Sequence, residues 1–200
     1  MFHYLSRLYK CTSIDSFVHV IIDWIVLGCY TGFRKSEWCS DHQDSFDTIN
    51  DPNWGDHTMA LPVIAKDFGS STKTSHRIRD LTSTPDDTIM FTSLCIRKQK
   101  NNDNGHMLMY RHHTDSSWMC PTQAGLNIIR WVNHLDTLHD HPVAVYHDPP
   151  NELHHQIMSN QVMAFLWHVA HKVFNIPAGH KDLLVWPCHS IHITAANLLD

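Results

Sequence analysis

The sequence predicts an α+β fold that is mainly α-helical and has a small antiparallel sheet of about three strands. The stretch 14–27 is apolar on nearly every face, which is typical of a helix buried in a core. Two later stretches, 124–138 and 160–174, repeat apolar side chains at helical spacing. Asn104-Gly105 lies between two runs of β-forming residues, and Asn-Gly favours the turn of a β-hairpin.

Length and composition indicate one packed domain. With 200 residues, 42% of them hydrophobic, the chain can bury a sizeable core, and its 18% of charged residues is too few for a disordered chain. The six cysteines are scattered without a Cys-x-x-Cys pair, which predicts reduced thiols in an intracellular protein. We expect no membrane span, because the apolar run 18–27 is too short and contains Asp23, and we find no signal peptide.

Net charge alone does not define the partner. The formal charge of -5 argues against a generic nucleic-acid binder. The 19 histidines weaken that argument, since roughly a quarter of them would be protonated near neutral pH. The most basic patch consists of Lys73, His76, Arg77 and Arg79. It is interpreted either as a solvated loop or as a phosphate contact.

The first part of the chain predicts a lead-in followed by one domain. Residues 1–13 form a short helical lead-in, or the end of a preceding domain, and 14–200 form the domain itself. Ser13 or Asp15 can cap the buried helix. Thr31-Gly32 ends this helix, because glycine tolerates the backbone conformations found at helix ends.

A second helix is predicted from Phe33 or Arg34. Arg34 and Glu37 are three residues apart and can meet as an ordinary ion pair at a helix-turn-helix joint. The stretch 44–57 is rich in Asp, Asn, Pro and Gly and is predicted to be a loop. The stretch 59–65 reads as a short strand, and its proline suggests an edge position.

The middle of the chain predicts the hairpin. Residues 66–85 are polar and are predicted to form a loop. The stretches 88–100 and 107–112 form the two hairpin strands, with Lys98 and Lys100 at the tip end of the first.

The rest of the chain predicts three helices. Thr122 can cap a helix over 124–138, and the Pro- and His-rich stretch 139–150 connects it to a helix over 159–174. A last apolar helix covers 189–199. Because the chain stops inside that helix, we expect the domain to be C-terminally incomplete.

Three motifs in order resemble one family. They are Thr31-Gly32-Phe33-Arg34-Lys35-Ser36-Glu37 after the buried helix, Gln99-Lys100-Asn101 beside the hairpin turn, and His189-Ser190-Ile191-His192 at the start of the last helix. Together they resemble the catalytic domain of the tyrosine recombinases, phage-integrase-like enzymes that break and rejoin DNA, and are similar to the crypton-like branch of eukaryotic mobile elements. The resemblance covers residues 14–199, and its most specific part is Thr-Gly-Phe-Arg. The family's separate amino-terminal DNA-clamping domain has no evident counterpart in the chain.

The resemblance implies a chemistry and roles for particular residues. Family members cleave one strand of double-stranded DNA by attack of a tyrosine on a phosphate, without a metal or a nucleotide cofactor. Arg34 would be the first of two arginines on the phosphate oxygens, positioned by Glu37, since a planar guanidinium gives two hydrogen bonds and stays charged. Lys100 would be the general acid, with Lys98 the weaker candidate, and His189 an acid/base near the phosphate. The further residues expected to contact DNA are Lys35, Arg77, Arg79 and Lys98.

Two departures predict impaired cleavage. The family pattern is His-x-x-Arg, whereas here the second arginine position is His192. A largely neutral imidazole cannot give the two hydrogen bonds and the permanent positive charge of an arginine. Losing an arginine that holds the phosphate lowers the rate of cleavage roughly a hundred- to thousand-fold. Family tyrosines also lie beyond this motif, whereas the five tyrosines of this chain all precede it: Tyr4, Tyr9, Tyr30, Tyr110 and Tyr146.

Three alternatives remain open at this point. One is a non-catalytic DNA-binding relic of a mobile element. Another is a His-rich metal-binding module, because His168 and His171 share a helix face, although no His-Glu-x-x-His motif occurs. The third is a helical scaffold whose motif matches are coincidental. A homo-oligomer on DNA is also left open, and a eukaryotic DNA-acting protein would lie in the nucleus.

Overall fold

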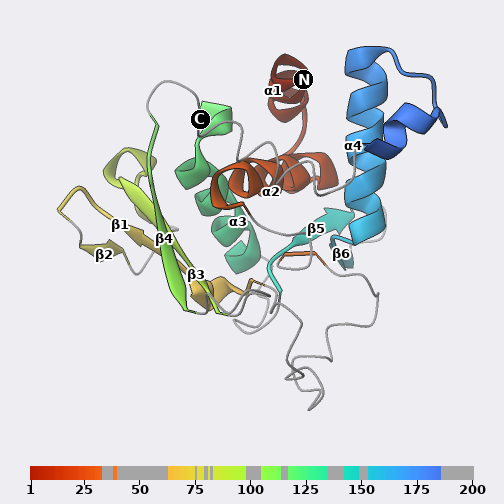
Figure 1. Ribbon diagram of the computed structural model, residues 1–200. Coiled ribbons are helices and arrows are strands. Elements are labelled where there is room, and N and C mark those ends of the chain that lie inside the picture. The colour runs from red at the N-terminus through yellow and green to blue at the C-terminus, as the bar shows by residue number, and fades with distance from the viewer. Residues whose placement is uncertain are drawn as a thin grey trace.

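The chain has an α+β architecture, which confirms that part of the prediction (Figure 1). The computed structural model describes residues 1–32, 38–39, 63–74, 76–78, 81, 83–97, 105–113, 117–134, 142–148 and 153–185. The α-helices are α1 (Phe2–Cys11), α2 (Phe17–Thr31), α3 (Pro121–His134) and α4 (Ser159–Phe174). The strands are β1 (Phe68–Ser71), β2 (Arg77–Ile78), β3 (Phe91–Ile96), β4 (His106–Arg111), β5 (Val145–Asp148) and β6 (Leu153–Gln156). Short 3-10 helices cover Ala65–Asp67, Asp86–Thr88, Ser117–Met119 and Lys181–Val185.

Helix α2 is the central element, and all its residues from His19 to Cys29 are buried. Its predicted cap was wrong. Ser16 precedes the helix, and its hydroxyl accepts a hydrogen bond from the His19 N–H at 3.3 Å. Ser13 instead hydrogen-bonds Asp15 and accepts the Ser16 N–H through its carbonyl, because the chain makes a turn before the helix begins.

The predicted end of α2 is confirmed. Gly32 has φ 67°, in the left-handed region that favours glycine, and its N–H donates to the Gly28 carbonyl at 2.9 Å. Trp38 then stacks on Trp24 at 5.2 Å between ring centroids, so the chain lies alongside α2 again seven residues after Thr31, the last residue of the helix. The helix predicted from Phe33 or Arg34 lies outside the described residues.

The predicted hairpin is also confirmed, with a shorter first strand and a second strand shifted by one residue. β3 and β4 pair antiparallel from Phe91 opposite Arg111 to Ile96 opposite His106. Gly105, just before β4, has φ 73°, a conformation that suits the end of a turn. The turn residues 98–104 lie outside the described part.

The predicted strand number was wrong. The structure has a four-stranded antiparallel sheet in the order β2-β1-β3-β4 and a separate antiparallel pair, β5-β6 (Figure 1). The stretch 66–85, predicted as a loop, contains β1 and β2, and 139–150 contains β5. These strands have two to four residues, so they are too short to show an alternation of apolar and polar residues in the sequence. Their hydrogen-bonded pairing with neighbouring strands identifies them instead.

Of the strand predicted over 59–65, only residues 63–65 are described. Ile64 makes an isolated antiparallel bridge to Pro142, and Ala65–Asp67 is a 3-10 turn. Asp67 fixes this turn, because its carboxylate accepts the Ile64 N–H at 2.9 Å and the Arg97 guanidinium at 2.9 Å.

Helix α3 packs on one face of the four-stranded sheet. A methyl group at Gly125 would lie 2.8 Å from Thr92 Cγ2, so only glycine allows this close approach. The predicted cap was wrong here too, since Thr122 is buried and its hydroxyl donates to the Tyr110 carbonyl at 2.9 Å. Cys120 precedes the helix instead, and its Sγ accepts the Gln123 N–H at 3.5 Å.

Helix α4 matches its predicted range. Its predicted apolar side chains Val162, Phe165 and Val169 are buried, and Asn175 ends it with φ 54°. Phe165 meets Phe17 of α2 edge to face at 6.4 Å between centroids.

No helix in the described part is long and apolar enough to cross a membrane. The helix predicted over 189–199 lies outside the described residues.

Candidate nucleic-acid interface

Most of the predicted site lies outside the described residues. This applies to Arg34, Lys35, Glu37, Arg79, Lys98, Lys100, His189 and His192. Arg77 is described, and its side chain is exposed on β2. The structure therefore describes the framework that flanks the candidate residues: the end of α2 and both ends of the β3-β4 hairpin.

The end of α2 lies against β4. The ring of Tyr30, two residues before Gly32, is 6.3 Å from Tyr110 and 5.6 Å from His113 between centroids. Burial raises the pKa of both phenols, so both are neutral near pH 7. The Tyr110 hydroxyl is buried and has no hydrogen-bond partner among the described residues. This junction brings the segment before Arg34 beside the hairpin.

A basic segment, Arg111 to His113, leaves β4 at this junction. Arg111 and His113 are exposed, whereas their backbone is fixed. The His112 N–H donates to the Met90 carbonyl at 2.7 Å, and the His113 N–H donates to Cys120 Sγ at 3.2 Å. Arg111 alternates with Tyr110 along β4, so its side chain points to the opposite face from the Tyr30–Tyr110 contact, whereas the ring of His113 lies against Tyr30.

The other end of the hairpin lies away from this junction. Tyr110 is opposite Thr92, whereas Lys98 follows Ile96, four residues further along β3. Four residues of strand span about 13 Å. At that far end Arg97 is ion-paired with Asp67 at 2.9 Å. The described strands thus bring the α2 end next to Tyr110 and not next to the residues that precede the predicted lysines.

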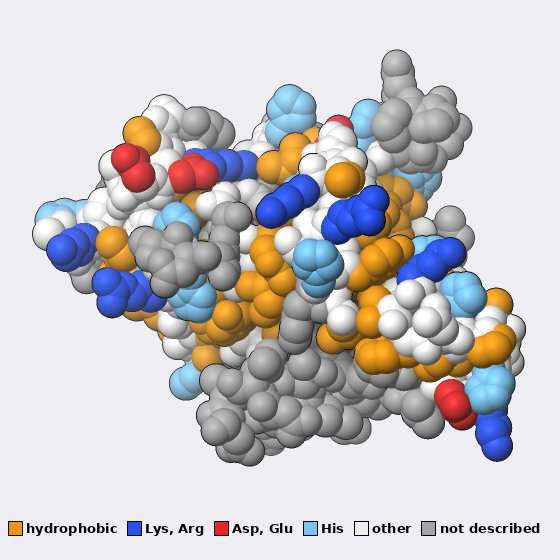
Figure 2. Space-filling view, turned by 90° about the horizontal axis from the view of Figure 1, so that it is seen from above, with side chains coloured by type: hydrophobic (Ala, Val, Ile, Leu, Met, Phe, Trp, Pro, Cys, Tyr) orange, Lys and Arg blue, Asp and Glu red, His pale blue; other side chains and the backbone are white. Residues whose placement is uncertain are grey.

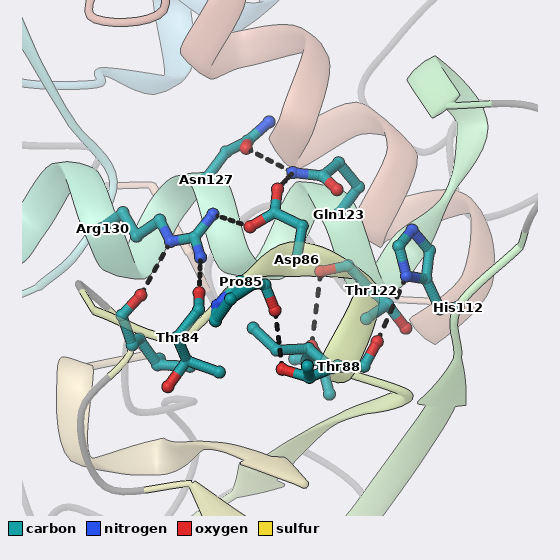
Figure 3. A network of polar contacts seen from close by, with 12 residues as sticks. Thr84, Pro85, Asp86, Thr88, His112, Thr122, Gln123, Asn127 and Arg130 are labelled. Carbon is teal, nitrogen blue, oxygen red and sulfur yellow. Dashed lines mark hydrogen bonds and ion pairs between the residues drawn. The ribbon is translucent and has the colours of Figure 1, made fainter. Parts of the chain in front are cut away.

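A polar network holds the segment before β3 on α3 (Figure 3). The Arg130 guanidinium donates to the carbonyls of Leu81 and Thr84, both at 3.0 Å, and pairs with Asp86. Gln123 also donates to Asp86, at 3.4 Å. All three guanidinium nitrogens of Arg130 are engaged, so this arginine has a structural role and does not replace the second phosphate-binding arginine.

A buried polar cluster joins α1, α2 and α3. The Asn127 amide donates to the Tyr9 hydroxyl at 2.7 Å and to both Asp23 oxygens at 3.2 and 3.4 Å. His19 stacks on Tyr9 at 3.9 Å, and its Nε2 lies 3.9 Å from Asp23. Desolvation raises the pKa of Asp23 well above its usual range and lowers the pKa of His19. The sequence signal for this cluster was a charged residue within an apolar helix.

The described residues offer no metal site. They contain no group of three or more His, Cys, Asp or Glu side chains placed to hold an ion. His168 lies 3.4 Å from the Tyr4 hydroxyl, and His171 hydrogen-bonds the Ile176 carbonyl, so each has a partner within the fold. The five cysteines of the described part are free thiols: Cys11, Cys29, Cys39, Cys95 and Cys120.

Charge is unevenly distributed along the chain. The stretch 41–56 has five Asp residues and neither Lys nor Arg, and it lies outside the described part. Figure 2 shows Lys, Arg and His side chains spread among hydrophobic ones on the face seen from above. The net charge of -5 therefore does not represent the described surface.

The chain was compared with protein-family models, with curated proteins and with solved structures, and none of them matches it.

Proposed function

We propose that the chain is a DNA-binding domain of the tyrosine-recombinase type, in which Arg34 contacts a backbone phosphate of duplex DNA. The observation that carries the proposal is the junction at the end of α2. Gly32 ends the helix in a left-handed conformation two residues before Arg34, and Tyr30 at that end lies against Tyr110 of the hairpin. The first motif therefore follows an element that lies beside the Tyr110 end of the hairpin.

Binding is favoured over strand cleavage by the chemistry of the motifs. A cleaving site needs two cationic clamps and a general acid on one phosphate. His192 is mostly neutral near pH 7, and the residue before Lys98 is paired with Asp67 a strand length from Tyr110. One arginine with neighbouring cations suffices to hold a phosphate without activating it.

The proposal is tested by duplex binding. Fluorescence anisotropy with a mixed-sequence duplex at about 50 mM salt is expected to give saturable binding that Arg34→Ala weakens about tenfold. Arg34→Lys is expected to restore only part of this loss, because lysine lacks the bidentate fork. Lys172→Ala, an exposed cation on α4, is the matched control and leaves binding unchanged. Equal affinities for wild type and Arg34→Ala would contradict the proposal.

Strand cleavage is the second candidate, because the resemblance includes the acid/base positions Lys100 and His189. A nicked suicide duplex separates it from binding alone. We expect no covalent protein-DNA adduct from the wild-type chain. An adduct that survives denaturing electrophoresis would replace the binding proposal by an enzymatic one.

A further inference from the structure

Side-chain alternation divides the four-stranded sheet into two faces. Thr92, Leu94 and Ile96 of β3 are buried on the face toward α3. Phe91 and Ser93 alternate with them and therefore point to the opposite side, which we call the outer face. The contacts of α3 with Thr92 belong to the inner face.

One cross-strand row on the outer face joins all four strands. Arg77 of β2 is opposite Ser71 of β1, Ser71 is opposite Phe91 of β3, and Phe91 is opposite Arg111 of β4. With neighbouring strands about 4.8 Å apart, the two arginines start about 14 Å apart on either side of the phenyl ring. Phe91 is half-buried and both arginines are exposed. Neither arginine is ion-paired with a described residue.

The rest of the outer face is uncharged, with exposed apolar side chains beside the small polar residues Ser71 and Ser93. The four strands contain no Asp or Glu. In the next rows, Met107 and Met109 of β4 are 54% and 62% exposed. The outer face thus combines an aromatic ring and flexible apolar side chains with cations at both ends, which is complementary to an anionic ligand that has flat stacking surfaces.

From this arrangement we propose that the outer face binds single-stranded DNA, with Phe91 stacking on a base and Arg77 and Arg111 contacting phosphates. A single strand is favoured over a duplex because only unpaired bases expose their faces to a side chain. The choice of DNA rather than RNA rests on the proposed function. The residues proposed to bind on this face, Arg77, Phe91 and Arg111, are different from Arg34, on which the proposed function depends.

The test measures anisotropy of a fluorescent oligothymidylate with the full chain. Phe91→Leu keeps an apolar side chain at this position and is expected to weaken binding about tenfold through the lost stacking. Arg77→Ala and Arg111→Ala are each expected to weaken binding about fivefold and to reduce its salt dependence. Lys172→Ala is the control and retains wild-type affinity. Wild-type binding by both Phe91→Leu and Arg111→Ala would overturn the proposal.

A second readout does not depend on variants. An oligothymidylate carrying photoreactive iodouracil is expected to crosslink to peptides that contain Phe91 or Met109, and crosslinks found only elsewhere overturn the proposal. Arg34→Ala is expected to weaken duplex binding about tenfold and to keep oligothymidylate binding, so failure of one proposal is distinguished from failure of the other. Tighter binding of oligouridylate than of oligothymidylate overturns DNA as the occupant.

Discussion

Asp23 is a carboxyl buried inside an apolar helix. It is fully buried, and its carboxyl is held by the Asn127 amide, while the nearest cationic candidate, His19, has its pKa lowered by burial. A carboxyl in this position favours the neutral form. We infer that the cluster joins three helices through a protonated carboxyl and not through an ion pair.

This assignment predicts how stability depends on pH. Because the pKa of Asp23 is higher in the folded state than in the unfolded state, its contribution is full below about pH 4 and is lost as pH rises through the folded pKa. His19 acts in the opposite direction, since a lowered histidine pKa costs stability as pH falls below about 6.5. The free energy of unfolding of Asp23→Asn relative to wild type should therefore rise from about pH 5 to about pH 8. Urea unfolding measures it, and a difference that does not vary with pH would contradict the protonated carboxyl.

Arg130 gives a second prediction at the residue scale. Its planar guanidinium binds two carbonyls and the Asp86 carboxylate at once, which a lysine ammonium cannot reproduce. Arg130→Lys should lower the free energy of unfolding by about 2 kcal/mol although the charge is kept. Urea unfolding with Lys172→Ala as control measures this loss. An Arg130→Lys variant as stable as wild type would show that the network contributes only charge.

The buried polar cluster could not be predicted from the sequence, because its residues are far apart along the chain. Asn127 meets Asp23 104 positions away and Tyr9 118 positions away. Helical spacing identifies the buried face of each helix but not which polar groups of two buried faces meet. Of the predicted site residues, only Arg77 lies in the described part, where it is exposed on β2.

At the level of elements, the close contact between α3 and the sheet predicts how substitutions at Gly125 and Thr92 change stability. Gly125→Ala gains about 1 kcal/mol of helix propensity, but its methyl would lie 2.8 Å from Thr92 Cγ2 and cost more than that. We expect a net loss of about 1 kcal/mol. Thr92→Ser removes the opposing methyl, so it should stabilise Gly125→Ala while destabilising wild type. A double-mutant cycle by thermal unfolding measures this, and the same sign in both backgrounds would exclude the steric explanation.

The elements also show which sequence patterns are informative. Helices α2 and α4 and the β3-β4 hairpin were predicted because each has a long apolar pattern or a turn with specific backbone requirements. β1 reads Phe-Gly-Ser-Ser and β2 has two residues, so neither has a pattern of its own. The predicted caps of α2 and α3 were wrong because residues near the true positions are equally good or better capping residues. Ser13 and Asp15 precede Ser16, and Thr122 follows Cys120.

At the scale of the whole molecule, two surfaces are proposed to contact DNA. One is the junction where α2 ends beside Tyr110, two residues before Arg34, and the other is the outer face of the four-stranded sheet. The outer face has the exposed arginines Arg77 and Arg111, and the acidic stretch 41–56 lies elsewhere in the sequence. A polyanionic partner is therefore compatible with a chain whose net charge is negative.

The salt dependence of duplex binding tests the central claim most directly. A protein that neutralises phosphates releases counterions, and each contact adds about 0.9 to the slope of log affinity against log salt. If Arg34 contacts one phosphate, Arg34→Ala should flatten this slope by about 1 relative to wild type, while Lys172→Ala keeps it. A slope that Arg34→Ala leaves unchanged, or a wild-type affinity that does not fall with salt, would contradict the claim that Arg34 holds DNA.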